Sequence, residues 1–113
     1  MSQKHLVAAC VLTLIGARGA WGEDVPPEIK LADARFDPAE VVVPVNTPFK
    51  VRVTNADTAA IEFESFELRR ERVVRPGETI TVFMPPLAPG TYPFFDDFHR
   101  DTPAGAIVAR SPE

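Results

Sequence analysis

The sequence predicts an all-β domain, a Greek-key β-sandwich of seven to eight strands. The chain has 113 residues, and its 12 prolines and 6 glycines divide it into short segments. No window shows a sustained helical repeat of apolar residues, whereas several segments alternate apolar and polar side chains with the period of a β-strand. Turn residues separate these segments at the spacing of a small sandwich, so a single domain without internal repeats is expected.

The first 22 residues are predicted to be a secretory signal peptide. Lys4 precedes an apolar run, residues 6–16, that is too short to span a bilayer. Ala20 and Gly22 are small residues spaced as in a signal-peptidase site, so we expect cleavage after Gly22. This interpretation places the mature protein in the periplasm.

Removal of this peptide leaves an acidic domain over residues 23–113. Two cations, Lys4 and Arg18, leave with the peptide and no acid does, so the formal net charge changes from −4 to −6. An acidic surface disfavours nucleic acid and anionic lipid as partners and attracts cations. Cys10 is also removed, and lipoprotein-type cleavage before it is the less favoured alternative because the apolar run continues beyond it. The domain has no thiol and one histidine, His99.

Four strands are predicted in the first half of the domain. Residues 29–36 form the first, and residues 40–45, rich in β-branched side chains, form the second. Pro44 indicates that this second strand is an edge strand or contains a bulge. Residues 49–54 and 60–66 alternate apolar and polar side chains, which is typical of strands with one buried and one solvated face.

Four further segments complete the predicted sandwich. Residues 68–74 are followed by a Pro-Gly turn, and residues 79–84 place three apolar side chains on one face. Residues 91–95 are aromatic and favour a buried strand, and residues 105–109 supply the last one.

The segment from Pro89 to His99 carries the most specific motif. It reads Pro-Gly-Thr-Tyr-Pro-Phe-Phe-Asp-Asp-Phe-His, in which Asp96, Asp97 and His99 follow the end of the aromatic strand. Side chains placed just beyond a rigid strand are held by the sheet and remain open to solvent. The motif therefore predicts a metal site at this end of the strand.

The motif resembles the C-terminal copper-ligand segment of cupredoxins, Pro-Gly-x-Tyr-x-Phe-x-Cys-x-x-His, with Asp96 in the position of the cysteine. A second segment is similar to the cupredoxin-like periplasmic proteins that accompany FTR1-type iron permeases; it comprises Glu62-Phe63-Glu64-Ser65, Leu68, Glu71 and Pro76-Gly77-Glu78-Thr79. The resemblance extends from Phe36 to Val108 and implies a cupredoxin fold.

Type 1 blue copper is excluded by composition. Such a centre needs two imidazoles and a thiolate, usually with a weak axial methionine. Residues 23–113 contain one histidine and no cysteine, and Ala104 lies where the methionine is roughly expected.

The remaining donors are mostly carboxylates. Asp96 and His99 have the spacing of the missing cysteine and its histidine, and they converge on one point if the loop folds as in cupredoxins. Glu62 and Glu64 share one face of a strand, and Glu71 or Glu67 joins them from the next segment. Such ligands suit Mn, Fe or Cu(II), and they favour Fe(III) over Fe(II), although Cu(II) binds most tightly in vitro. The predicted metal ligands are Asp96, His99, Glu62, Glu64 and Glu71.

Each of these residues also has a structural interpretation. His99 is then a loop residue hydrogen-bonded to a carboxylate, Glu62 and Glu64 are the solvated face of a strand, and Asp97 points to solvent. A cationic stretch pairs with these acids or forms a docking surface; it comprises Arg69, Arg70, Arg72 and Arg75.

The resemblance implies a periplasmic accessory protein of ferrous-iron uptake that binds iron and/or copper. It assists Fe(II) oxidation or iron delivery without acting as a stand-alone oxidase. The implied partners are an FTR1-type iron permease and an associated periplasmic iron-binding protein, with the chain a monomer or homodimer and peripheral to the membrane at most. Two alternatives remain open. One is a non-redox docking module that has lost its metal site, and the other is a copper-binding carrier, although the Met and Cys clusters of Cu(I) carriers are absent.

Overall fold

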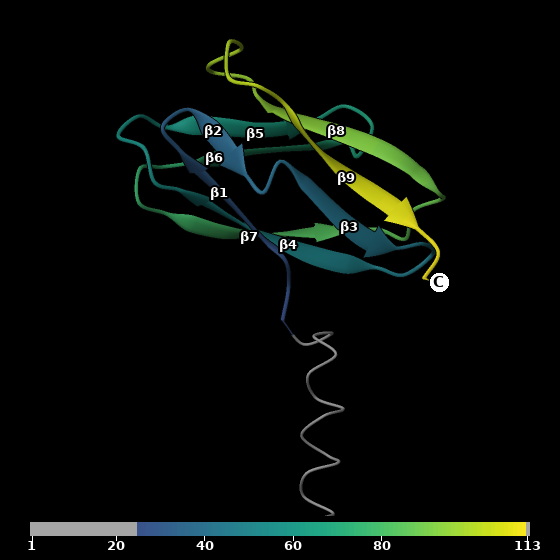
Figure 1. Ribbon diagram of the computed structural model, residues 1–113. Coiled ribbons are helices and arrows are strands. Elements are labelled where there is room, and N and C mark those ends of the chain that lie inside the picture. The colour runs from purple at the N-terminus through teal and green to yellow at the C-terminus, as the bar shows by residue number, and fades with distance from the viewer. Residues whose placement is uncertain (1–24, 113) are drawn as a thin grey trace, which may run out of the picture.

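The computed structural model describes residues 25–112, which form nine β-strands in two stacked sheets and no helix (Figure 1). The strands are β1 (Glu28–Ala32), β2 (Arg35–Asp37), β3 (Glu40–Pro44), β4 (Phe49–Asn55), β5 (Ile61–Ser65), β6 (Arg70–Val74), β7 (Thr79–Met84), β8 (Gly90–Asp96) and β9 (Gly105–Arg110). The predicted all-β sandwich is confirmed, with one strand more than expected. The predicted signal peptide lies outside the described residues. Residues 25–112 contain no helix that is long and apolar enough to cross a membrane.

The two sheets combine strands that are distant in sequence. One sheet has the order β2-β1-β4-β7, and the other has the order β3-β9-β8-β5-β6. The pairs β1–β4 and β3–β9 are parallel, and the remaining pairs are antiparallel. Strand β3, which ends at Pro44, is an edge strand as predicted, because proline cannot donate to a second neighbour.

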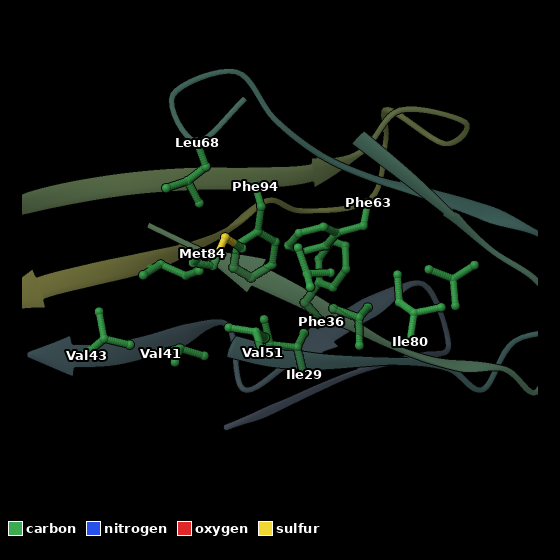
Figure 2. Close-up of a cluster of buried hydrophobic side chains, with 14 of the residues drawn as sticks. Ile29, Phe36, Val41, Val43, Val51, Phe63, Leu68, Ile80, Met84 and Phe94 are labelled. Carbon is green, nitrogen blue, oxygen red and sulfur yellow. The ribbon is translucent and has the colours of Figure 1, made fainter. Parts of the chain in front are cut away.

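The core lies between the two sheets and follows the alternation of the strands. Three aromatic rings meet near its centre, where Figure 2 shows Phe36, Phe63 and Phe94 together. The Phe94 ring centroid lies 5.0 Å from that of Phe36 in an edge-on arrangement and 5.0 Å from that of Phe63. Burial of these rings anchors β8 and β5, the strands that carry the candidate site, against the opposite sheet.

The predicted first strand, residues 29–36, is in fact a hairpin. Asp33 and Ala34 both have positive φ, 52° and 58°, and form the two-residue turn between β1 and β2. The Asp57 carboxylate, from the loop after β4, accepts the N–H groups of both turn residues at 2.7 and 2.9 Å. Asp-Ala is not a common sequence for such a turn, and its partner is remote in sequence, so the local pattern could not predict it.

Two arginines of β6 bridge the sheets along one side of the sandwich. Arg70 Nε donates to the carbonyl of Phe83 at 2.9 Å, and Arg72 Nη1 donates to that of Thr81 at 3.4 Å. Strand β7 is the edge of its sheet, so these arginines supply donors to its carbonyl groups. The interpretation that Arg70 and Arg72 pair with the acids of β5 is therefore wrong.

Candidate metal centre

Strand β5 carries two predicted ligands on its outer face. Ile61 and Phe63 point into the core, whereas Glu62 and Glu64 are half-buried on the opposite face. Glu71 of β6 lies directly opposite Glu64 in the antiparallel register. Directly opposed residues share a face of the sheet, so Glu71 lies on the same face as Glu62 and Glu64.

Asp97 completes a cluster with two of these glutamates. One carboxylate oxygen each from Glu62, Glu64 and Asp97 lies within 4.8 Å of the other two. The Asp97 N–H donates to the Glu62 carbonyl at 2.9 Å, which fixes the start of the loop beside β5. Oxygen ligands at roughly 2.0–2.6 Å from one ion lie at most about 5 Å apart, so these side chains are close to a chelating geometry. We call these three residues the carboxylate cluster.

Sequence reasoning left Asp97 out of the candidate site. The cupredoxin spacing favours its neighbour Asp96 as a ligand and places Asp97 on the solvated face of the loop. Asp97 directly follows Asp96, the last residue of β8, and consecutive residues of an extended chain point to opposite sides, so only one of the two aspartates reaches the glutamates. The register of β5 against β8, with Glu64 opposite Phe95, decides for Asp97, and that register is not visible in the sequence.

The cluster concentrates negative charge. Burial raises the pKa of Glu62 to about 7, together with hydrogen bonding to Glu71 and Asp97 and repulsion from Glu71 and Glu64. Burial likewise raises the pKa of Glu64, assisted by repulsion from Glu71 and Asp97 and opposed by Arg100. A cation placed between these carboxylates would favour their ionised forms and so lower the pKa of both Glu62 and Glu64.

Asp96 and His99 come together as predicted, but as a hydrogen-bonded pair. The Asp96 side chain is 1% exposed, and its Oδ1 atom accepts the N–H groups of Glu62 and Phe98, each at 3.0 Å. Its Oδ2 atom lies 2.7 Å from His99 Nδ1. The carboxylate is thus held by three donors and fastens the loop to β5.

This contact sets the tautomer of His99. An ionised carboxylate only accepts hydrogen bonds, so Nδ1 carries a proton, and in the neutral imidazole Nε2 then has the free lone pair. The side chain is 46% exposed. A histidine oriented by a carboxylate through one nitrogen is the usual arrangement of a histidine metal ligand.

His99 lines a pocket that the carboxylate cluster does not share. The pocket has a volume of about 360 Å³ and lies between the β1–β2 turn, the loop after β4 and the loop after β8. Leu31 and Ile61 form its apolar wall, and Asp57 and Asp101 contribute polar groups. The five predicted ligands therefore form two groups, Asp96 with His99 and the three glutamates, and metal binding by either group stays a prediction.

Comparison with known proteins identifies the domain type. A family model described as "Cupredoxin-like domain" matches residues 5–109. An uncharacterized protein of Rickettsia prowazekii (strain Madrid E) is 43% identical over 81 residues, which cover 72% of this chain. The matched part spans 65% of the length of that relative.

Solved structures share the fold at low sequence identity. The metal-binding domain of a Cu(I)-exporting P-type ATPase from Streptococcus pneumoniae, solved with Cu(I), has a TM-score of 0.66 at 15% identity and covers 74% of this chain and 83% of its own. A reduced Cu(I) form of amicyanin has a TM-score of 0.63 at 14% identity, with coverages of 76% and 83%. A purple cupredoxin from Nitrosopumilus maritimus has a TM-score of 0.58 at 16% identity, with coverages of 74% and 99%.

Proposed function

The chain belongs to the family of cupredoxin-like domains, and it shares its fold with copper-binding proteins. We propose that it is a periplasmic metal-binding accessory protein of iron uptake. In this role the carboxylate cluster binds iron and assists either its oxidation or its delivery to an FTR1-type permease, directly or through an associated periplasmic iron-binding protein. Iron is the cargo of the protein.

The observation that carries this proposal is the convergence of Glu62, Glu64 and Asp97 on the outer face of β5 and β8. Carboxylate oxygens are hard ligands that suit Mn and Fe and stabilise Fe(III) more than Fe(II). Residues 25–112 contain no cysteine and one histidine, so this donor set does not fit type 1 copper.

The residues have distinct roles in binding. Glu62 and Glu64 are fixed by a strand paired on both sides, and Asp97 is fixed by its backbone hydrogen bond to Glu62. Glu71 adds negative charge from β6. Because the pKa of Glu62 is about 7, a fraction of the molecules carry a proton on this carboxyl group at neutral pH, and cation binding releases that proton.

Oxidation of Fe(II) releases one electron, and the cluster has no side chain that accepts it. A bound Cu(II), a partner protein or oxygen is the acceptor. The protein therefore assists oxidation by favouring the ferric product, consistent with a role that is not that of a stand-alone oxidase.

Copper binding at His99 is a second candidate function. The Asp96 contact leaves Nε2 free beside the pocket, and imidazole suits Cu(II). The copper named for two of the structural relatives supports this candidate.

Calorimetric titration with Mn(II), anaerobic Fe(II) and Cu(II) tests both candidates. We expect one-to-one Mn(II) and Fe(II) binding that is lost in the Glu62→Gln/Glu64→Gln variant and kept in His99→Ala. Glu28→Gln/Glu40→Gln, which removes two exposed carboxylates elsewhere, is the matched control and should bind normally.

The other outcomes have clear meanings. Cu(II) binding lost only in His99→Ala would establish the second candidate. Absence of saturable binding of every ion would refute the proposed function and leave the docking module.

A further inference from the structure

Arg100 lies against the carboxylate cluster. Its Nε atom donates to Asp97 Oδ1 at 2.6 Å, and its Nη2 atom contacts the same oxygen. The guanidinium carbon lies 4.9 Å from the centre of the Phe95 ring. Phe95 is directly opposite Glu64 in the register of β8 and β5, so the cation lies on the same face as the cluster.

The charge of Arg100 extends beyond Asp97. Burial and repulsion from Glu71 and Asp97 raise the pKa of Glu64, whereas Arg100 lowers it. Within residues 25–112, Arg100 is the arginine or lysine that forms an ion pair with the cluster. Arg70 and Arg72, which are close in sequence to Glu71, are engaged by β7 instead.

The ion pair between Arg100 and Asp97 is exposed and can be broken at low cost in free energy. The Arg100 side chain is 65% exposed, and exposed ion pairs contribute little to stability. The Asp97 carboxylate that Arg100 holds is also one of the three groups that would ligate a metal ion. A divalent cation and the guanidinium therefore compete for the same carboxylate. Phe95 keeps the displaced guanidinium nearby, because an arginine cation is attracted to an aromatic face.

We infer that Arg100 is a displaceable counterion of the carboxylate cluster, which occupies Asp97 in the free protein and leaves it when a multivalent cation binds. A monovalent ion gains nothing by replacing a guanidinium, whereas an ion of higher charge does, so Arg100 selects for charge. This inference rests on the proposed function, since it requires that the cluster binds metal.

The first test compares Mn(II) affinities by calorimetry. Arg100→Met keeps an unbranched side chain on Phe95 but removes the competing cation, and we expect Mn(II) affinity to increase about threefold, which is within the range typical of one exposed ion pair. Arg110→Met removes the same charge at the far end of β9, roughly 20 Å along the strands, and should increase affinity clearly less. Arg100→Lys keeps the charge without the planar fork and should lie between wild type and Arg100→Met.

The second test observes displacement directly. The Nε–H signal of Arg100 is followed by proton–nitrogen NMR while diamagnetic Zn(II) is added to the full protein. One equivalent should shift this signal to the position of a free arginine, and the Glu62→Gln/Glu64→Gln variant should show no shift.

The outcomes separate the two proposals. Cluster-dependent Zn(II) binding with an unchanged Arg100 signal, and an Arg100→Met affinity equal to that of Arg110→Met, would overturn the counterion role and leave the proposed function intact. If neither the wild type nor Arg100→Met binds metal at the cluster, both the proposed function and the counterion role are refuted.

Discussion

Asp96 connects three parts of the molecule through one buried carboxylate. It satisfies backbone donors of β5 and of the loop after β8, and it orients the ring of His99. The sequence predicted that Asp96 and His99 lie together, because their spacing matches a known motif. The backbone partners were not predictable, since Glu62 is 34 residues away and its N–H becomes available only through the β5–β8 register.

Replacing Asp96 by asparagine should reverse the tautomer of His99. The amide oxygen can still accept from Glu62 and Phe98, but the amide nitrogen donates to Nδ1, which moves the imidazole proton to Nε2. Nitrogen chemical shifts of the imidazole will detect this change. Loss of the charged acceptor should also lower the free energy of unfolding by about 1–2 kcal/mol in urea denaturation. An unaltered pattern of imidazole shifts would contradict the assigned hydrogen bond.

The two faces of strand β5 have different roles in the domain. The inner face packs into the core through Ile61 and Phe63, and the outer face presents Glu62 and Glu64. This division was predictable, because alternation of apolar and acidic residues fixes which side chains share a face. The identity of the third carboxylate was not, because it depends on which residue of a neighbouring strand lies opposite.

The raised pKa of Glu62 predicts a pH dependence of stability. A carboxyl group whose pKa is about 7 when folded and near 4.5 when unfolded binds more protons in the folded state between these values. Its stabilising contribution is therefore complete below the unfolded pKa and is lost as pH rises through the folded one. As the pH rises from about 5 to about 8, we expect the thermal midpoint of metal-free wild type to decrease relative to that of Glu62→Gln. Glu40→Gln, on the exposed face of β3, is the matched control and should follow wild type.

The β6–β7 side of the sandwich predicts a second effect at the scale of elements. Arg70→Met removes the Nε donor to the Phe83 carbonyl and the two hydrogen bonds that Nη1 donates to the turn before β6, and should reduce the free energy of unfolding by about 1 kcal/mol. Chemical denaturation of this variant beside Arg75→Met, which changes an exposed arginine of the following turn, measures it. Equal stability of the two variants would show that the bridge to β7 contributes nothing.

For the whole molecule, the sequence specified the architecture better than the site. Seven of the eight predicted strands coincide with an observed strand within about two residues, a margin usual for strand ends, because alternation and turn residues act locally. The exception is the segment 29–36, which a turn held by Asp57 divides into β1 and β2. Interactions between residues far apart in sequence account for both this error and the omission of Asp97.

Metal binding should stabilise the entire domain. A ligand that binds only the folded state at about 100 times its dissociation constant adds about 2.7 kcal/mol, which corresponds to roughly 10–20 °C in thermal midpoint for a domain of this size. Differential scanning calorimetry with Mn(II), followed by excess chelator, measures the gain and its reversal. The Glu62→Gln/Glu64→Gln variant should show neither, and a comparable gain in that variant would place the bound ion elsewhere.

The placement of the carboxylate cluster on the solvent face of a strand whose other face fills the core has a consequence for sequence divergence. The half-buried glutamates on that outer face lie outside the hydrophobic core, so they can be exchanged for other polar residues without rebuilding the interior. Asp96 is more constrained than the residues of the outer face, because any replacement must still accept the backbone N–H groups of Glu62 and Phe98. The domain thus offers a surface whose polar side chains can change while the scaffold beneath it stays constant.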